Sequence, residues 1–226
     1  MYKRQGLTLC NARGVHDAST AELAVGLAIS SRRGFPEFMR EQIAGTWSHH
    51  RPAALTDSKI GNVGFGSIGK KIAQNLSGFE VSITAFTQSG RDGSLTIDQL
   101  DAHLPNLDIV ILILPLSDSS RHLFNKTLLA KMKDGALLIN VARGPVVDTD
   151  ALIAELNSGR IFAALDVTDP EPLPQGHPLW SAPNLQIVPH VGGNSEAFEP
   201  RGRALIESQL KLLAAGSPLE HVVAQG

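Results

Sequence analysis

The sequence predicts an α/β fold in which helices cover both faces of a doubly wound parallel sheet. From Ile60 onward, short apolar runs that read as strands alternate with helical patterns. These runs are apolar almost throughout, which is typical of strands buried on both faces of a parallel sheet. The sequence Gly64-Phe65-Gly66-Ser67-Ile68-Gly69 follows one of the strands and opens a helix, as in dinucleotide-binding sheets.

Composition and charge narrow the classes of function. The 226 residues carry a formal net charge of −2, from 20 basic and 22 acidic side chains, which gives no reason to expect a nucleic-acid or anionic-membrane partner. The single cysteine, Cys10, excludes an intramolecular disulfide and is typical of a reducing compartment. The longest apolar run, Ile109–Leu116, is far shorter than the roughly 20 residues that span a bilayer. We therefore expect a soluble, cytoplasmic protein, and we assign no metal site from the sequence.

The first residues of the chain have an unusual origin in our interpretation. Residues 1–5 are what GTG-TAT-AAG-AGA-CAG encodes when GTG is the start codon. This string resembles the end of a transposon adaptor used to prepare sequencing libraries. We therefore predict that residues 1–5 are an assembly scar and that the gene extends further upstream. The apolar run Leu7–Cys10 that follows is predicted to be a strand.

A long helical pattern comes next. Ser19 and Thr20 precede it, and it runs from Ala21 to about Ile43, with Pro36 expected to kink or divide it. The segment Trp47–Thr56 has no periodicity and is predicted to be a loop. The helix also carries small residues that suit close packing, either against a second chain or within this one: Ala24, Gly26, Ala28, Ser30 and Ser31.

The remaining elements are predicted from the alternating pattern. The strands are Ile60–Val63, Val81–Ala85, Ile109–Leu114, Ala136–Asn140, Ala163–Val167 and Gln186–Val188. The helices between them are Ser67–Leu76, Asn125–Met132 and Asp148–Asn157, and a final helix runs from about Ser195 to Ala215. The proline-rich segment Pro170–Pro183 is predicted to be a rigid surface loop.

The glycine-rich turn has the chemistry of a pyrophosphate site. Its first glycine permits a tight turn, its second lets backbone approach the phosphates, and its third lets the helix pack closely on the strand. The helix N-terminus favours anions. The alternative is a turn with a structural role only, but the strand before it and the helix after it favour nucleotide binding. The candidate cofactor-binding residues here are Gly64, Gly66, Ser67, Ile68 and Gly69.

Asn62 is unexpected in the strand before this turn, since a buried amide without partners costs roughly 1–3 kcal/mol. It either bonds to nearby backbone or weakens the fold.

The segment after the second strand bears on the choice of cofactor. An acidic residue there would bond the ribose 2′-hydroxyl and reject a 2′-phosphate, and Ala85–Ser89 contains none. Thr87, Ser89 and Arg91 could instead hold a phosphate, which favours NADPH slightly over NADH. The alternative is that Arg91 is a solvated loop charge beside Asp92.

Arg143, Glu171 and His190 each lie at or just after the end of a predicted strand, where doubly wound sheets place their sites. An arginine grips a carboxylate bidentately and polarises the adjacent carbonyl. A histidine transfers protons near neutral pH, and a nearby carboxylate favours its imidazolium. Each residue could alone be a loop or capping residue. Their joint occurrence predicts hydride transfer to and from a substrate that carries a carboxylate.

The motifs together resemble the D-isomer-specific 2-hydroxyacid dehydrogenases, which include glyoxylate, hydroxypyruvate and phosphoglycerate dehydrogenases. The resemblance covers nearly everything from Asn11 to about Val223. It rests on Asn11–Gly14, Thr20–Ala24, the Gly64–Gly69 turn, Leu114–Leu116, Asn140–Asp148, Asp166–Pro172 and Pro189–Gly193.

The resemblance implies a role for each site residue. Arg143 would bind and orient the substrate, Glu171 would pair with the histidine, and His190 would be the acid/base. Asp166 would meet the nicotinamide amide. Further residues implied to line the cofactor cleft are Pro115, Ser117, Val141, Ala142 and Gly192.

The family also has a substrate-binding lobe before the nucleotide domain, and most of that lobe has no counterpart here. Residues 1–18 would be its remnant, residues 19–190 the dinucleotide-binding domain, and residues 191–226 a helix returning to the lobe. We expect little or no turnover from this chain as written. The resemblance further implies a homodimer in the full-length protein, with the Ala21–Ile43 helix in the contact.

We accordingly predict hydride transfer between NAD(P)H and a small 2-oxo acid or D-2-hydroxy acid. One alternative is a nucleotide-sensing, corepressor-like binding protein of the same fold. Another is a relative that acts on formate or phosphite.

Overall fold

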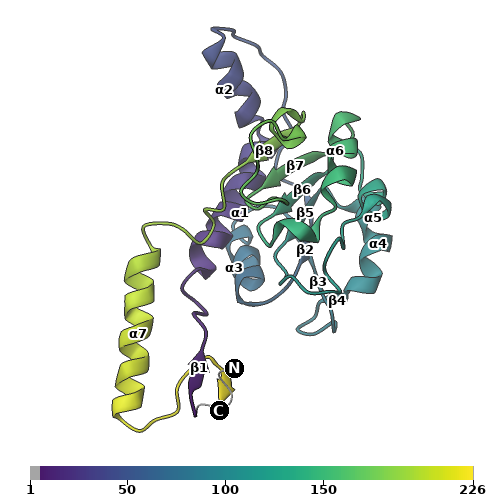
Figure 1. Cartoon of the computed structure of the whole chain (residues 1–226). Coiled ribbons are helices and arrows are strands. Elements are labelled where there is room, and N and C mark those ends of the chain that lie inside the picture. The colour runs from purple at the N-terminus through teal and green to yellow at the C-terminus, as the bar shows by residue number, and fades with distance from the viewer. Residues whose placement is uncertain (1–5, 226) are drawn as a thin grey trace.

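The computed structural model describes residues 6–225, so the predicted scar at residues 1–5 lies outside the described residues. Its centre is a seven-stranded sheet in the order β4-β3-β2-β5-β6-β7-β8, and every neighbouring pair is parallel (Figure 1). The strands are β2 (Lys59–Val63), β3 (Ser82–Thr87), β4 (Leu95–Thr96), β5 (Ile109–Leu112), β6 (Leu137–Asn140), β7 (Phe162–Leu165) and β8 (Leu185–Ile187). The chain builds outward from β2 in one direction and then from β5 in the other. The predicted doubly wound parallel sheet is therefore confirmed, with its topological switch between β2 and β5.

Seven α-helices lie within the described residues. They are α1 (Asp17–Arg32), α2 (Phe35–Ile43), α3 (Ser67–Leu76), α4 (Leu100–His103), α5 (Lys126–Lys131), α6 (Thr149–Asn157) and α7 (Phe198–Ala214). Those that cover the two faces of the sheet are α1, α3, α4, α5 and α6. Short 3₁₀ turns cover Ile97–Gln99, Leu104–Asn106, Gly144–Val146 and Pro178–Ser181. The sequence did not predict β4, α4 or the 3₁₀ turns, because they are too short to show a periodic pattern.

Alternation along the central strands gives the protein two apolar cores. In β5, Ile109 and Ile111 face one core, which α1 and α3 complete. Val110 and Leu112 face the other, which α5 and α6 complete. Because successive side chains of a strand point to opposite faces, continuous apolar runs were the correct signature of strands covered on both sides.

The predicted Ala21–Ile43 helix is divided into α1 and α2. Gly34 has φ +68° at the N-cap of α2, a left-handed conformation that glycine adopts without steric cost. Pro36 lies in the first turn of α2, where its missing N–H breaks no helical hydrogen bond. Ala24 and Ala28 are fully buried in the core beneath α1. The sequence left open whether the small residues pack against a second chain or within this one. Ala24 and Ala28 pack within this one.

A second, smaller unit stands apart from the sheet. The predicted strand at Leu7–Cys10 is present as β1 (Thr8–Cys10) and pairs antiparallel with β9 (Val222–Gln225), which was not predicted. Figure 1 shows this pair and α7 set away from the sheet and joined to it by two extended segments. No residue of α7 is buried. Within residues 6–225, no helix combines the length and apolar character needed to cross a membrane.

Candidate active site

A cavity of about 790 Å³ opens at the carboxyl ends of the strands, across the switch between β2 and β5. Five strand ends contribute to its lining: Gly66–Gly69 after β2, Ile113–Leu116 after β5, Val141–Arg143 after β6, Asp166 after β7 and His190 after β8. The structure thus brings together most of the residues singled out in the sequence, because the carboxyl ends of parallel strands share one edge.

The three glycines of the Gly64–Gly69 turn are under different steric constraints. Gly64 has φ +105°, and a Cβ there would lie 2.3 Å from the Ile113 carbonyl oxygen. A Cβ on Gly69 would lie 2.2 Å from the Gly64 carbonyl oxygen. Gly66, by contrast, has nothing within 4 Å of its Cβ position and is the N-cap of α3 with no side-chain cap. The turn therefore packs closely against protein backbone at Gly64 and Gly69 and has free space beside Gly66. A pyrophosphate-binding turn requires this combination.

Asn62 holds this turn by a side-chain hydrogen bond. Its side chain is fully buried, and Nδ2 donates a 2.8 Å hydrogen bond to the Gly69 carbonyl oxygen. Of the two readings offered by the sequence, the bond to nearby backbone is thus the one observed. Its Oδ1 is buried and has no partner among the described residues.

The segment after β3 does not reach this cavity: Thr87, Ser89 and Arg91 are not among its lining residues. The Thr87 hydroxyl is buried and lies 2.7 Å from Ser94 Oγ, so it is engaged within its own loop. Lys70, in the first turn of α3, lies 2.8 Å from Asp92. The hydrogen bond from Lys70 lowers the pKa of Asp92. Arg91, next to Asp92 in the chain, is exposed.

The turns after β5 and β6 are held by buried polar side chains. Ser120 Oγ donates to the Pro115 carbonyl oxygen at 2.8 Å and accepts from the Ser117 amide at 2.7 Å. Pro115 lines the cavity, whereas Ser117 does not.

Asn140 holds the turn after β6 by hydrogen bonds, as Ser120 holds the turn after β5. Its Oδ1 accepts from the Ala142 amide and its Nδ2 donates to the Arg143 carbonyl oxygen, both at 3.0 Å. Val141 and Ala142 form buried walls of the cavity, and Arg143 lies exposed beside them. The Arg143 guanidinium donates to the Ala142 carbonyl oxygen at 2.5 Å.

Asp166 positions the loop that carries His190. Its carboxylate is buried and accepts from the Val191 amide at 2.7 Å and from the Gly192 amide at 3.0 Å. Its backbone carbonyl accepts from the His190 amide at 2.8 Å. A Cβ on Gly192 would lie 2.8 Å from the carboxylate, so this position requires glycine. The sequence marked Asp166 and Gly192 for the cofactor, and holding the loop that carries His190 is a further role of Asp166.

Glu171 and His190 are in direct contact. Nδ1 of His190 is hydrogen-bonded to Glu171 Oε1, and both side chains are partly exposed. His190 lines the cavity, whereas Glu171 does not. His190 has φ +54°, a conformation that is costly for a residue with a side chain. It is held here by the hydrogen bonds that the His190 amide donates to the carbonyl oxygens of Asp166 and Val188. Because Glu171 occupies Nδ1, Nε2 is the ring nitrogen left to exchange a proton with a ligand.

The cavity also has walls that the sequence did not indicate: His16, Thr20, Asn194 and Phe198. His16 Nδ1 lies 3.0 Å from the Gly193 carbonyl oxygen, and its ring stacks on Phe198 with centroids 5.0 Å apart. His16 and Asn194 lie in the two segments that join the sheet to the smaller unit, Thr20 lies in α1, and Phe198 is the first residue of α7. No spacing in the sequence relates them, since they meet only in the tertiary structure.

Comparisons with known proteins agree with this architecture. A sequence model described as "D-isomer specific 2-hydroxyacid dehydrogenase, NAD binding domain" matches residues 25–192. Human glyoxylate reductase/hydroxypyruvate reductase is 34% identical, over 96% of this chain and 70% of its own length. Hydroxypyruvate reductase of Thermotoga maritima is 32% identical, over 93% of this chain and 72% of its own length.

A solved structure gives the same result in three dimensions. The D-isomer specific 2-hydroxyacid dehydrogenase of Xanthobacter autotrophicus Py2, in complex with NADPH and MES, superposes with a TM-score of 0.83 at 30% identity. The match covers 96% of this chain and 92% of that one. The chain therefore belongs to the D-isomer-specific 2-hydroxyacid dehydrogenases.

Proposed function

We propose that this protein transfers a hydride between NAD(P)H and a small 2-oxo acid or D-2-hydroxy acid, with Arg143, Glu171 and His190 as its catalytic residues. The observation that carries the proposal is the Glu171–His190 pair, whose histidine lines the same cavity as Arg143 and the glycine turn. The relatives reported above are named for reductase or dehydrogenase activities. They give no support to the corepressor-like alternative.

The cofactor fits the residues present. The open Cβ position at Gly66 and the uncapped N-terminus of α3 suit a pyrophosphate, which the first turn of α3, with Ser67 and Ile68 lining the cavity, would hold. Val141 and Ala142 supply apolar walls, and Pro115 closes the side after β5. When bound, the nicotinamide supplies the hydride.

The protein's own residues then manage charge and protons. Arg143 binds the substrate carboxylate through its planar guanidinium and orients the adjacent carbonyl. His190 donates a proton from Nε2 to the carbonyl oxygen as negative charge develops there. Glu171 holds the ring in place through Nδ1 and stabilises the imidazolium before that proton leaves. In the direction of oxidation the same groups act in reverse.

For the cofactor we propose a slight preference for NADPH, resting on Ser89 and Arg91 and on the absence of an acidic residue in Ala85–Ser89. Parallel fluorescence titrations with NADH and NADPH test it. Tighter binding of NADH would contradict it.

We also propose a homodimer in which α2 forms the contact, and a cytoplasmic location consistent with the one unpaired cysteine, Cys10. Phe35, Met39 and Ile43 recur every four residues along α2 and are all exposed. Trp47 follows them with 97% of its surface exposed. An exposed apolar stripe of this kind is typical of a protein–protein contact.

Replacement of His190 by alanine tests the catalytic assignment. In the full-length protein we expect turnover to fall about 10²- to 10⁴-fold, the usual contribution of a general acid or base, while NAD(P)H affinity stays within about twofold because the imidazole does not hold the cofactor. His49→Ala, at an exposed site outside the cavity, is the control. Glyoxylate, hydroxypyruvate and formate are each tried as substrate with NAD(P)H or NAD(P)⁺. Turnover that survives in His190→Ala would remove His190 from the mechanism, and turnover of formate alone would favour the formate alternative.

A further inference from the structure

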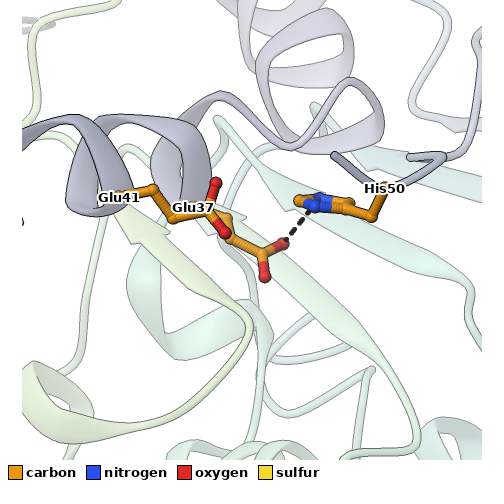
Figure 2. A group of neighbouring side chains, drawn as sticks. All are labelled: Glu37, Glu41 and His50. Atoms are coloured by element: carbon orange, nitrogen blue, oxygen red, sulfur yellow. Dashed lines mark ion pairs between the residues drawn. The ribbon is translucent and has the colours of Figure 1, made fainter. Parts of the chain in front are cut away.

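The loop that follows α2 brings an imidazole beside two carboxylates, away from the active-site cavity. Glu37 and Glu41 lie one helical turn apart on α2, so their side chains share a face. Figure 2 shows His50 returning from the loop to face them, with one ligand atom of each residue within 4.8 Å of the others. None of the three lines the cavity that holds Arg143 and His190.

The ring of His50 is held in a defined orientation. It stacks on Phe38 with ring centroids 4.7 Å apart, and its Nε2 lies 3.4 Å from Glu37 Oε2. That nitrogen is covered from solvent, yet it has no well-aligned hydrogen bond within the described part of the chain. A covered polar atom without a partner destabilises the folded protein. The contact with Glu37 therefore does not satisfy the hydrogen-bonding capacity of Nε2.

The charges around His50 point to the kind of ligand. Glu37 and Glu41 bring two like charges close together, which is unfavourable unless a positive charge lies between them. Among residues 6–225, no lysine or arginine lies within 4.0 Å of either carboxylate. A cation bound between the two carboxylates and Nε2 would balance the charge and satisfy the nitrogen together.

We propose that Glu37, Glu41 and His50 bind one divalent transition-metal ion, with Zn²⁺ as its representative. Bonds of about 2.0–2.2 Å from zinc to imidazole nitrogen and carboxylate oxygen place neighbouring ligands of a tetrahedral site roughly 3.4 Å apart. The Nε2–Oε2 separation of 3.4 Å already has this value. Rotation of the Glu41 side chain completes the set, and solvent takes the fourth position. The imidazole disfavours Mg²⁺ and Ca²⁺, which prefer oxygen ligands.

The site is compatible with the proposed dimer. Glu37 and Glu41 are offset by two positions from Phe35 and Met39, which is about 200° around a helix. The metal would therefore bind on the side of α2 opposite the apolar stripe. The sequence did not indicate the site, because nothing in the spacing shows that the loop folds back onto the helix.

Titration of the whole chain with Zn²⁺ by calorimetry, in the presence of millimolar Mg²⁺, tests the proposal. We expect one ion per chain and at least about tenfold weaker binding in His50→Ala and in the double variant Glu37→Gln/Glu41→Gln. His49→Ala, which removes the neighbouring exposed imidazole, is the matched control and should bind as the parent does. Glutamine keeps the size of glutamate, so the double variant remains informative even if His50→Ala fails to fold.

Co²⁺ then locates the ion by paramagnetic broadening of backbone amide signals. We expect broadening centred on residues 34–52. Broadening centred on Glu171 and His190 instead would overturn the proposal, as would no Zn²⁺ binding or equal binding by parent and variants. None of these readouts depends on turnover, so failure of the proposed enzymatic function would leave the test intact.

Discussion

At the scale of single residues, the site depends on buried polar side chains that hold backbone rather than substrate. Asn62, Asn140 and Asp166 each follow or lie in a central strand, and each bonds the turn beyond it. Because a buried polar group without partners is costly, these side chains and the turns fix one another. The residues proposed as catalytic, Arg143 and His190, are more exposed and are positioned by these neighbours.

Asp166→Asn tests this dependence. An amide has one acceptor oxygen where the carboxylate has two, so either Val191 or Gly192 loses the acceptor for its amide. We expect unfolding in urea to require about 1–3 kcal/mol less free energy, and turnover to fall because the His190 loop is released. Asp169→Asn, three residues along the chain, is the control. Equal stability of Asp166→Asn and the parent would show that the carboxylate does not brace the loop.

At the scale of elements, the other end of the sheet contains a pH-sensitive contact. Asp108, just before β5, accepts from the Lys59 amide at 2.8 Å and from the Lys133 ammonium at 2.7 Å. Burial raises the pKa of Asp108, but these hydrogen bonds outweigh it and hold the pKa below its ordinary value. A carboxyl group whose pKa is lower in the folded protein stabilises the fold above its unfolded pKa of about 3.9 and loses that contribution as the pH falls.

Acid unfolding of Asp108→Asn is the corresponding measurement. We expect the parent to lose stability as the pH falls below about 4, and the variant to lose less over the same range, starting from a lower stability at pH 7. Parallel curves for the two proteins would contradict the assignment.

The helices differ in how much they contribute to stability. Leu156 of α6 is fully buried, whereas Leu213 of α7 is 64% exposed. We expect Leu156→Ala to cost about 2–5 kcal/mol, as in other buried cores, and Leu213→Ala to stay within about 0.5 kcal/mol, as at exposed positions. Chemical denaturation measures both. A large loss for Leu213→Ala would mean that α7 packs against a partner.

At the scale of the whole molecule, the sheet with α1, α3, α4, α5 and α6 forms the body, and α2, α7 and the β1–β9 pair extend from it (Figure 1). We propose that the β1–β9 pair and α7 belong to the substrate-binding lobe and that the sheet is the dinucleotide domain. The absence of buried residues in α7 supports this division.

The proposed dimer is tested at this scale. Sedimentation velocity at micromolar concentration should give twice the 24.1 kDa chain mass for the parent. Met39→Asp places a charge in the apolar stripe and should give the single-chain mass, since an unpaired charge is costly in an apolar interface. Glu41→Gln, on the other side of α2, should leave the mass of the parent unchanged. A parent that sediments as a monomer would contradict the dimer.

The sequence by itself determined six of the seven strands of the sheet, the helices α3, α5 and α6, and the placing of Arg143, Glu171 and His190 after strand ends. Periodicity is a local property, and the edge at which parallel strands end follows from their direction alone. The break at Gly34 was only partly predictable, because Pro36 marked it and the left-handed turn did not.

Only the tertiary structure decided which polar groups meet across the chain. His16 contacts Gly193 and Phe198, Lys70 pairs with Asp92, and His50 returns to Glu37. The tertiary structure alone likewise decided the pairing of β1 with β9 and the hydrogen bond from the Val191 amide to Asp166. No regular spacing in the sequence relates the segments that make these contacts. Their geometry is set by how the whole chain packs.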